Sequence, residues 1–493
     1  MSAPFDLARQ RFLTRCTVVS LPKPSPGAPP PSVVYYMHRD CRVQDNWAMV
    51  RASQLAREHS VPLKVFYPLF PSFGNMSSRQ YSFQLAGLAA VEAELRELRV
   101  AFHLDHSSPP AAAVPAFAAA HGAIAVVTDH LPLRLLRSTN AAVAAELDAL
   151  PGPVPLIQVD AANVVPVWEA SGKREVGART LRPKIGKLYG RFLTQFPPVP
   201  KMPAGSPLPP PTDWSAARAA LKVAQVPDAP GLTAGTAAGM AHFRGFCETR
   251  LKKYAAVRND PNEDAQSGMS PWVRFGQVGF QRLALDARKL GKHGEGVAAF
   301  IEEGVVRREL SDNFCFYNEE YDNLKGAAGW ARESLELHNK DKREYTYTLA
   351  QFEKGETHDD LWNAAQLQLV GEGRMHGFMR MYWAKKILEW TESAEQALEW
   401  GLLLNDKYAM DGSCPNGYVG VAWSVMGTHD MGWKERDVFG KIRFMNYAGC
   451  KRKFQIEPFV SRYPPAAENC RKAGGEVALA PGVKAGKKKQ KKA

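Results

Sequence analysis

Two tryptophans with helical spacing are the first candidates for chemistry in this chain. Trp383 and Trp390 are seven residues apart, so on a helix they lie two turns apart on nearly one face. Their separation along the helix axis would be about 10.5 Å, and indole rings in such a row can relay an electron. Tryptophans with this spacing are also ordinary residues of a helix core, so the spacing alone leaves both interpretations open.

Charged pairs are the second candidates, and their spacing is less informative. Glu303 and Arg307 stand four residues apart in a stretch that predicts a helix, which favours a helix-stabilising or solvated pair. The same interpretation covers a pairing of Arg380 with Asp411 across two helices. Spacing alone therefore identifies no catalytic carboxylate.

The sequence lacks the usual phosphate-binding and metal-binding motifs. The nearest match to a dinucleotide loop, Gly371-Glu-Gly-Arg-Met-His-Gly377, has the wrong last spacing and lies in a helical stretch. There is no P-loop and no paired-histidine zinc motif. The seven cysteines are scattered without ligand spacing, which indicates reduced intracellular thiols. We predict no metal site, and a dehydrogenase or an ATPase is disfavoured.

The elements that must position these residues change character once along the chain. In the first third, short runs rich in β-branched and aromatic residues alternate with amphipathic stretches at 47–58 and 78–98. Strands separated by helices predict right-handed crossovers and a mostly parallel sheet, hence a Rossmann-like α/β domain. The expected strands are 33–37, 63–69, 100–104, 123–128 and 155–159.

The rest of the chain is predicted to be helical. The proline-dense stretch 196–211 is typical of an extended linker. Helical periodicity follows, with a start at Ser270-Pro271, where serine can cap and proline suits the first turn, and a long helix over 375–390. The expected organisation is a disordered leader at 1–32, an α/β domain at 33–196, a linker at 197–239, a larger all-α domain at 240–466 and a basic disordered tail at 467–493.

Charge and the two ends give weaker indications. The formal charge is +13, and six lysines in the last ten residues supply part of it, so the body fits a nucleic-acid partner without requiring one. The lysine tail is typical of a nuclear-localisation signal or of a solubilising end. Arg9, Arg11 and Arg15 give the leader the bias of a transit peptide, and an unstructured leader is the alternative. No apolar run is long enough to span a bilayer, which predicts a soluble protein.

Longer strings, found in order over about 33–461, carry a specific resemblance. They include Tyr35-Tyr-Met-His-Arg-Asp-Cys-Arg-Val-Gln-Asp-Asn-Trp47, Val306-Arg-Arg-Glu-Leu-Ser-Asp-Asn-Phe314, Thr357-His-Asp-Asp-Leu-Trp-Asn-Ala-Ala-Gln366, Met375-His-Gly-Phe-Met-Arg-Met-Tyr-Trp-Ala-Lys-Lys386, Leu404-Asn-Asp-Lys-Tyr408 and Gly432-Trp-Lys-Glu-Arg436. These strings resemble class II cyclobutane pyrimidine dimer photolyases, members of the photolyase/cryptochrome family.

The resemblance implies a cofactor and its contacts. In that family the α/β domain can hold an antenna chromophore such as 8-hydroxy-5-deazaflavin, and the helical domain clasps a bent FAD. Arg380 and Asp411 resemble the salt bridge beside the flavin ring, and Asn405 resembles the amide facing flavin N5, with Asn416 as the second candidate. Gly268 stands where the family often carries a larger residue. The residues that would contact the phosphates and the ribityl chain are Tyr254, Ser267, Met269, Ser270, Gln277 and Arg308.

The same resemblance implies a mechanism. Trp383, Trp362 and Trp390 are similar to the proximal, middle and distal members of an electron-transfer chain that reduces the flavin to FADH⁻. Excited FADH⁻ would donate an electron to the dimer, the cyclobutane bonds would open, and the electron would return. The cofactor carries this chemistry without net redox change, and the protein positions it. The implied activity is that of a carbon–carbon lyase.

The implied partner is double-stranded DNA that contains a cyclobutane pyrimidine dimer. Such enzymes extrude the damaged pair from the duplex, which costs little because the dimer is already badly paired. By resemblance, Glu303 contacts the pyrimidine edge, Met381 and Trp423 form the walls, and Trp433 and Arg443 occupy the gap or hold the backbone. We expect a monomer that works in the nucleus or the chloroplast.

Two rival functions share part of this pattern. A cryptochrome-like photoreceptor would keep the fold and FAD but signal through partners, and a light-independent flavin oxidoreductase would oxidise a nicotinamide in darkness. No nicotinamide site is recognisable in the sequence. The presence of Glu303, Met381, Trp423 and Asn405 favours repair over signalling.

Overall fold

A computed structural model describes residues 3–22, 26–203 and 208–478, so the lysines of the predicted tail at 484–492 lie outside the described residues. The chain divides into two compact units built from segments distant in the sequence. The first unit contains Met1–Ala255, Gln266–Tyr321 and Met410–Val419. The second unit contains Ala256–Ala265, Asp322–Ala409 and Gly420–Ala493. The two units are described separately.

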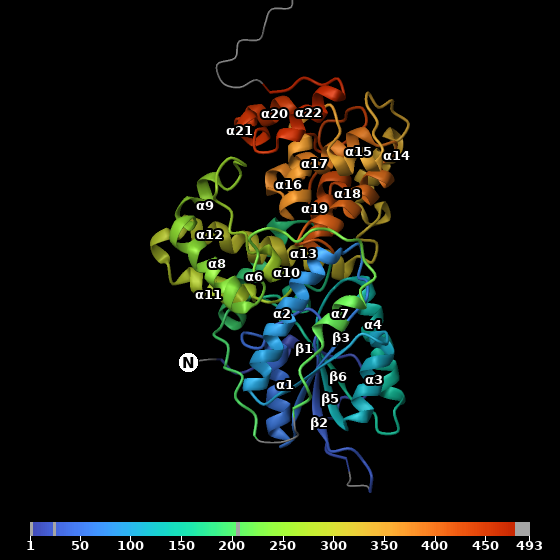
Figure 1. Ribbon diagram of the computed structural model, residues 1–493, viewed down its shortest axis with the longest axis vertical. Coiled ribbons are helices and arrows are strands. Elements are labelled where there is room, and N and C mark those ends of the chain that lie inside the picture. Colours follow the sequence, from blue (N-terminus) through green and yellow to red (C-terminus); the bar gives the residue numbers. More distant parts are fainter. Residues whose placement is uncertain (1–2, 23–25, 204–207, 479–493) are drawn as a thin grey trace, which may run out of the picture. The chain divides into compact units, whose positions relative to one another are not determined.

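A six-stranded sheet forms the framework of the first unit (Figure 1), in the order β1-β6-β5-β2-β3-β4. Every neighbouring pair is parallel except β1 and β6, which are antiparallel. The five predicted strands are all confirmed to within one or two residues. The strands are β1 Gln10–Phe12, β2 Ser32–Tyr36, β3 Leu63–Pro68, β4 Ala101–Asp105, β5 Ala123–Asp129 and β6 Leu156–Val159.

Alternating side chains of the strands enter two separate cores. Tyr35 and Val127 belong to the core on the side of helix α1, whereas Val34 and Val126 belong to the core on the side of α3 and α4. Because successive side chains of a strand point to opposite faces, the parallel strands are buried on both sides. The α/β prediction is confirmed. The helices of this region are α1 Trp47–Glu58, α2 Ser78–Glu97, α3 Pro110–Ala120, α4 Arg134–Ala149, α5 Val167–Ala170 and α6 Ala178–Phe192.

The segment expected to be a disordered leader contains ordered structure. Residues 10–12 form the edge strand β1, which pairs with β6 through the register Arg11↔Gln158. The guanidinium of Arg9 is buried and donates hydrogen bonds to the carbonyls of Val164 and Phe192, both at 2.9 Å. A three-residue edge strand is too short to produce a recognisable alternation in the sequence. Arg9, one of the three arginines that suggested a transit peptide, is therefore a structural residue here.

A bundle of short helices completes the first unit. Within the stretch expected to be a linker, α7 (Trp214–Ala219) packs its indole on Phe102, with ring centroids 6.2 Å apart. At the predicted start Ser270-Pro271, Ser270 is the first helical residue rather than the cap, and Met269 occupies the cap position. The remaining helices are α8 Thr236–Thr249, α9 Leu251–Val257, α10 Ser270–Arg274, α11 Phe280–Arg288, α12 Gly294–Ile301 and α13 Arg308–Tyr317, of which α9 contains residues of both units.

The second unit is helical, as predicted. Its central helix α16 packs against α17, α21 and α22, and α17 packs against α18. Among the described residues, no helix combines the length and the apolar character needed to cross a bilayer. The helices are α14 Gly329–His338, α15 Leu349–Lys354, α16 Asp360–Glu372, α17 Gly377–Trp390, α18 Ala394–Tyr408, α19 Pro415–Met426, α20 Tyr447–Lys451, α21 Ile456–Val460 and α22 Pro464–Lys472, of which α19 contains residues of both units.

Candidate active site

A cavity of about 230 Å³ in the first unit brings together residues that the sequence placed far apart. Its wall includes His38 and Arg39, which follow strand β2, and aromatic residues such as Phe280 and Phe300. Eight of the residues singled out in the sequence line it: Tyr254, Ser267, Met269, Ser270, Glu303, Arg308, Asp411 and Asn416. The hydroxyl, carboxylate and guanidinium groups therefore share one pocket with aromatic surfaces.

Glu303 lies on an irregular part of the helix predicted around Glu303 and Arg307. Residues Glu302–Arg307 form a π-helical segment between α12 and α13, a geometry often found at functional sites. Gly304 lies directly against the ring of Phe280, because a Cβ built on Gly304 would lie 1.6 Å from Phe280 Cζ. A glycine is therefore required where the segment crosses the ring, and Glu303 is held at the cavity beside it.

Buried hydrogen bonds fix the wall behind Arg308. Its Nε donates to the carbonyl of Gly304 at 2.9 Å and its Nη2 to the carbonyl of Ala162 at 2.8 Å. The neighbouring Glu309 accepts the N–H of Val164 at 2.6 Å, and burial raises the pKa of Glu309 to about 8 although the charge of Arg308 opposes that change. The guanidinium of Arg308 is thereby oriented before any ligand binds.

A second buried pair joins the end of β2 to α13. Arg39 contacts both carboxylate oxygens of Asp312, at 2.8 and 3.1 Å. Burial alone would raise the pKa of Asp312, but the charge and hydrogen bonds of Arg39 hold that pKa below its usual value. This bidentate pair anchors Arg39, which lines the cavity, on the helix that follows Glu303.

Gly268, which departs from the family pattern, lies in the segment before α10 and packs against His242. Gly268 has φ +67°, and a Cβ there would lie 2.8 Å from His242 Nε2. That nitrogen in turn lies 2.9 Å from the carbonyl oxygen of Ser267. The histidine fills the space that a larger side chain at position 268 would need.

Gln277 is the one expected cofactor contact of the first unit that does not line the cavity. The resemblance placed it at the cofactor, but it is fully buried and is not part of the cavity wall. Its Oε1 accepts the N–H of Gly235 at 2.7 Å, and its Nε2 donates to the carbonyl of Phe83 at 3.1 Å. Because both amide atoms bind backbone groups, Gln277 holds segments of the first unit together.

The three tryptophans of the expected chain lie in contact in the second unit. The rings of Trp362 and Trp383 are parallel within 7°, with centroids 6.4 Å apart, and the centroid of Trp390 lies 5.9 Å from that of Trp362. Each indole is at most 1% exposed. Trp362, on α16, lies between two residues of α17, in the order that the resemblance implies.

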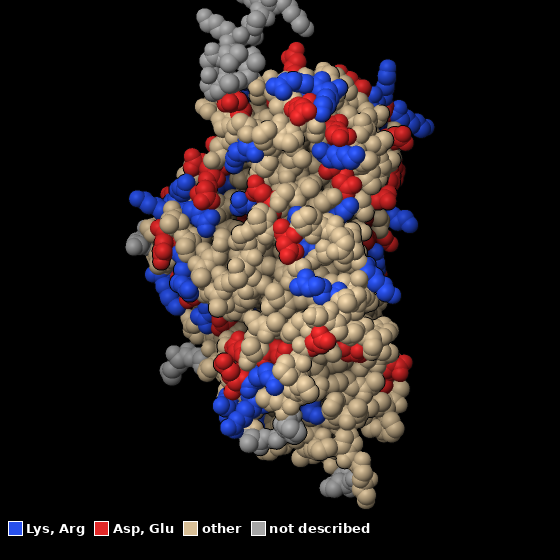
Figure 2. All heavy atoms as spheres, in the orientation of Figure 1, with Lys and Arg blue, Asp and Glu red and all other residues tan. Residues whose placement is uncertain are grey.

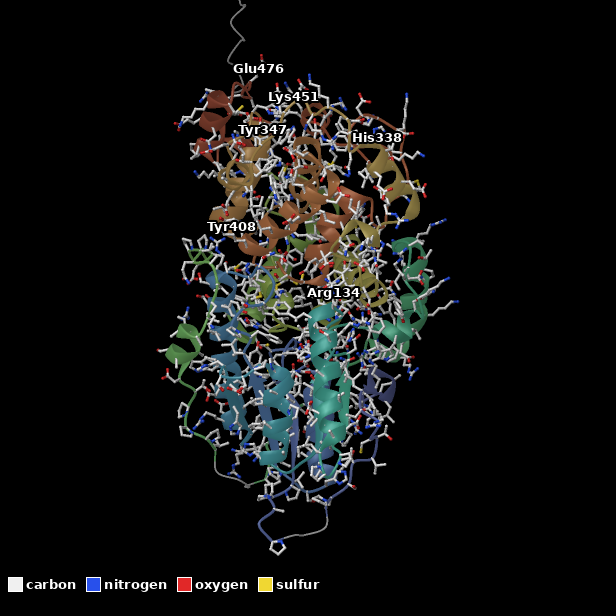
Figure 3. All side chains as sticks on the ribbon, turned by 90° about the vertical axis from the view of Figure 1, so that its right-hand side faces the viewer. Arg134, His338, Tyr347, Tyr408, Lys451 and Glu476 are labelled. Atoms are coloured by element: carbon white, nitrogen blue, oxygen red, sulfur yellow. The ribbon has the colours of Figure 1, made fainter. Side chains whose placement is uncertain are left out.

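Aromatic residues that the sequence did not single out continue from Trp390. The centroid of His358 lies 5.0 Å from that of Trp390, and Tyr347 (Figure 3) lies 5.6 Å from it. Tyr345, which is 40% exposed, stacks on His358 at 3.7 Å. These residues stand in an irregular segment and a helix start, where no periodicity indicates which rings meet.

The residues expected to form the lesion walls lie near a buried lysine. Trp423 donates from Nε1 to Asp430 Oδ2 at 3.4 Å. Lys385, one helical turn after Met381, donates to the carbonyl of Ser424 at 3.1 Å, and burial lowers the pKa of Lys385 to about 8. No local pattern distinguishes this lysine from others, because its burial depends on long-range packing.

The remaining expected residues are placed as follows. Asn405 is buried on α18 and donates to Asp406 Oδ1 at 3.1 Å. Trp433 is 49% exposed, and the guanidinium of Arg443 lies 4.7 Å from its ring centroid. Arg380 belongs to the second unit and Asp411 to the first, so their pairing stays a prediction.

Comparisons with known proteins agree with the resemblance. The sequence profile of a family described as DNA photolyase matches residues 33–204. A deoxyribodipyrimidine photo-lyase of Potorous tridactylus is 51% identical over 88% of this chain and 81% of its own length. One of Oryza sativa subsp. japonica is 46% identical over 94% of both chains.

A solved structure supports the fold. The crystal structure of a bacterial class III photolyase from Agrobacterium tumefaciens matches with a TM-score of 0.68 over 94% of both chains, at 17% sequence identity. At that identity the match concerns the fold alone, whereas the two photo-lyases are similar over most of their length. The chain therefore belongs to the DNA photolyase family.

Proposed function

We propose that this protein repairs cyclobutane pyrimidine dimers in DNA by light-driven electron transfer, with FAD as its cofactor. The observation that carries the proposal is the cavity of the first unit. The site residues that the resemblance assigns to that unit all line the cavity except Gln277, and they include Glu303 and Arg308. A polar group for a base edge and donors for phosphates thus occur in one pocket.

The residues present fit a dinucleotide cofactor. Ser267, Ser270 and Arg308 supply hydroxyl and guanidinium donors of the kind that bind a diphosphate, and Tyr254 and Phe300 supply aromatic surfaces. In its reduced form, bound FAD supplies an electron donor that can be excited by blue light. The pairing of Arg380 with Asp411 and the approach of Asn405 to the flavin ring are part of the proposal.

The three tryptophans would conduct electrons toward the flavin. Their indoles are in van der Waals contact or nearly so and are buried from water. We assign Trp383 as the proximal, Trp362 as the middle and Trp390 as the distal member. This row of three tryptophans serves the reduction of the cofactor, and repair by an already reduced protein does not need it.

Substrate recognition is assigned to the residues that the resemblance implies. The carboxyl group of Glu303 would accept or share a proton with the pyrimidine edge, and Met381 and Trp423 would pack against the extruded rings. Trp433 and Arg443, both exposed, would fill the gap left in the duplex or hold its backbone. Figure 2 shows Lys and Arg interspersed with Asp and Glu on the face drawn. On that face, phosphates would be bound by individual basic side chains rather than by a continuous basic patch.

An antenna chromophore such as 8-hydroxy-5-deazaflavin is proposed at the carboxyl ends of the parallel strands. Tyr36 and Thr128 are register partners on β2 and β5, and their hydroxyl oxygens are buried. These oxygens and the amide of buried Asn140 have no hydrogen-bond partner among the residues that the structure describes. Ligands of α/β sheets bind at this end of the strands, and buried polar atoms are normally satisfied.

We also propose that the protein acts as a monomer in the nucleus or the chloroplast. The lysine-rich end and the arginines near the start support these two locations. Burial of Arg9 in the first unit weakens the transit-peptide interpretation. The nuclear alternative rests on the lysines at the other end, which lie outside the described residues.

Extraction of the chromophores from purified protein, followed by absorption spectra, tests the cofactor assignment. The proposal predicts FAD in near-stoichiometric amount, with or without a second chromophore. Binding to dimer-containing duplexes should weaken steeply with salt, because lysines and arginines would displace counterions from the phosphates. A flat salt response in a filter-binding titration would count against the DNA partner.

A further inference from the structure

An exposed loop of the second unit packs on one face of helix α14. The loop, residues 427–446, follows α19 and includes Met431, which is 74% exposed, and Trp433, which is 49% exposed. Arg443 stacks on the Trp433 ring at 4.7 Å. Large apolar side chains that remain in solvent need a rigid support if they are to be presented in one conformation.

One stripe of helix α14 supplies that support. Trp330, Ser334 and His338 are spaced by four residues and therefore lie on one face of the helix. The ring of Trp330 lies against the loop backbone, because a Cβ on Gly427 would be 2.8 Å from its Cη2 and a Cβ on Gly432 would be 3.5 Å from its Cε3. The first turn of α14 thus holds the start of the loop.

The middle of the stripe binds the return of the loop. Ser334 Oγ accepts the N–H of Lys441 at 2.8 Å. Gly440 has φ +51°, and a Cβ there would lie 2.2 Å from Ser334 Oγ. The loop backbone also pairs with itself, since Trp433 N–H donates to the carbonyl of Lys441 at 2.9 Å. The backbone of Trp433 is therefore tied to the returning segment of the loop, which is bound by Ser334.

His338 closes the far end of the stripe, where α14 stops (Figure 3). Its Nδ1 lies 2.5 Å from Asp341 Oδ2, and its Nε2 lies 3.1 Å from Glu435 Oε1 of the loop. Asp341 Oδ2 also accepts the N–H of Val438 at 2.8 Å. Val438 has φ +67°, a conformation that a β-branched residue rarely adopts, so this hydrogen bond holds a strained position.

The charge state of His338 decides whether both contacts are hydrogen bonds. A neutral imidazole has one N–H, whereas the imidazolium has two. The charged groups that face the ring are Asp341, in the turn after α14, and Glu435, on the loop; Arg343 is beyond them and donates to the carbonyls of His338 and Asp341. With carboxylates on both sides, the imidazolium is the form that satisfies every partner.

We propose that protonated His338, with Asp341 and Glu435, is a positioning group that clamps the 427–446 loop and so presents Trp433 and Arg443 to damaged DNA. The inference rests on the proposed function for the role of the two exposed residues. The clamp itself is a property of the free protein.

The clamp has a definite pH dependence. The hydrogen bond with Asp341 raises the pKa of His338 above its usual value. A raised histidine pKa stabilises the structure most at low pH, and that stabilisation is lost as pH rises through the raised value. The loop should therefore be fixed below the ordinary histidine pKa and should loosen as pH rises through the raised value.

Amide hydrogen exchange of the free protein tests the clamp without DNA. In wild type, the protection of the Val438 and Lys441 amides, corrected for intrinsic exchange, should fall as pH rises through the pKa of His338. His338→Gln should reduce protection at low pH by at least about fivefold, the scale of a lost charge-assisted hydrogen bond, and should remove its pH dependence. Glu435→Gln, at an exposed position that should leave folding intact, should reduce protection in the same direction, while Glu336→Gln elsewhere on α14 should match wild type.

Protection that is independent of pH in wild type, or equal in wild type and both clamp variants, would overturn the clamp. The DNA role is measured separately by lesion affinity at low pH. Affinity should fall in Trp433→Ala, and it should fall by a smaller factor in His338→Gln. If Trp433→Ala binds the lesion as tightly as wild type, the proposed role of the loop in DNA binding is wrong, whatever the exchange data show.

Discussion

The indole rings of Trp362 and Trp383 are parallel within 7°, with centroids 6.4 Å apart, although the residues come from different helices. Each ring also binds the other helix by a hydrogen bond. Trp362 Nε1 donates to the carbonyl of Trp383 at 3.0 Å, and Trp383 Nε1 donates to Gln366 Oε1 at 2.8 Å. Stacking and hydrogen bonding together fix both rings at one separation, which a relay of electrons requires.

Substitution of Trp383 by phenylalanine separates the relay from repair. We expect Trp383→Phe to reduce light-driven reduction of the bound flavin to background, because the ring assigned as the proximal member would be replaced by one that is much harder to oxidise. Dimer repair by chemically reduced protein should stay close to the wild-type rate. Trp400→Phe, in the same unit but not one of the three relay tryptophans, is the control. Transient absorption and a repair assay measure the two activities, and an equal loss of both would show that Trp383 is a structural residue.

The sequence predicted the framework well and the relay only in part. Runs such as 123–128 are β-branched and continuous, so the parallel strands were recognisable without any knowledge of their neighbours. Trp383 and Trp390 could be placed on one helix face for the same local reason. That Trp362 lies between them depends on how α16 packs on α17, and no spacing within one helix determines such a contact.

The parts that were not foreseen have other physical causes. The π-helical segment at Glu302–Arg307 arises where Gly304 crosses the ring of Phe280, a contact between distant segments. The edge strand β1 is too short for a periodic pattern, and the burial of Arg9 and of Gln277 depends on carbonyls contributed by other segments. Tertiary contacts of this kind leave no local signal in the sequence.

Gly304→Ala tests how the π-helical segment is held. An added methyl group would collide with Phe280, and we expect it to lower the free energy of unfolding by about 1–3 kcal/mol, the usual cost of overpacking. It should also displace Glu303 and lower repair. Gly245→Ala on α8, where nothing lies within 4 Å of the new Cβ, should instead be neutral or slightly stabilising. Denaturant unfolding compares the two, and similar stabilities of both variants would contradict the packing argument.

Glu309 should make the stability of the protein decline as pH rises. Its pKa is raised by burial to about 8, so between the ordinary glutamate value and pH 8 the folded state binds more protons than the unfolded state. Unfolding free energy should then fall over that interval, by on the order of a few kcal/mol from this group. Glu309→Gln should flatten the decline, whereas Glu248→Gln on the exposed side of α8 should preserve it. Identical pH profiles for wild type and Glu309→Gln would refute the assignment.

Glu303→Ala should affect the yield of repair more than the affinity for damaged DNA. The carboxyl group is assigned to one hydrogen bond with the pyrimidine edge, and the loss of a bond worth ~1.5 kcal/mol corresponds to about a tenfold lower yield per bound lesion. The adjacent Glu302→Ala, which removes an ion pair with Arg182 at 2.7 Å, is the matched control and should repair normally. A collapse of affinity with an unchanged yield would assign Glu303 to binding alone.

The most direct measurement is the repair of a single defined lesion under blue light. Purified protein with its flavin chemically reduced would be mixed with an oligonucleotide containing one thymine dimer and illuminated, with a dark sample beside it. The account predicts restoration of two intact thymines in the light only, with no net change in the redox state of the flavin. Protein that carries reduced FAD and binds the lesion, yet leaves the dimer intact in the light, would contradict it.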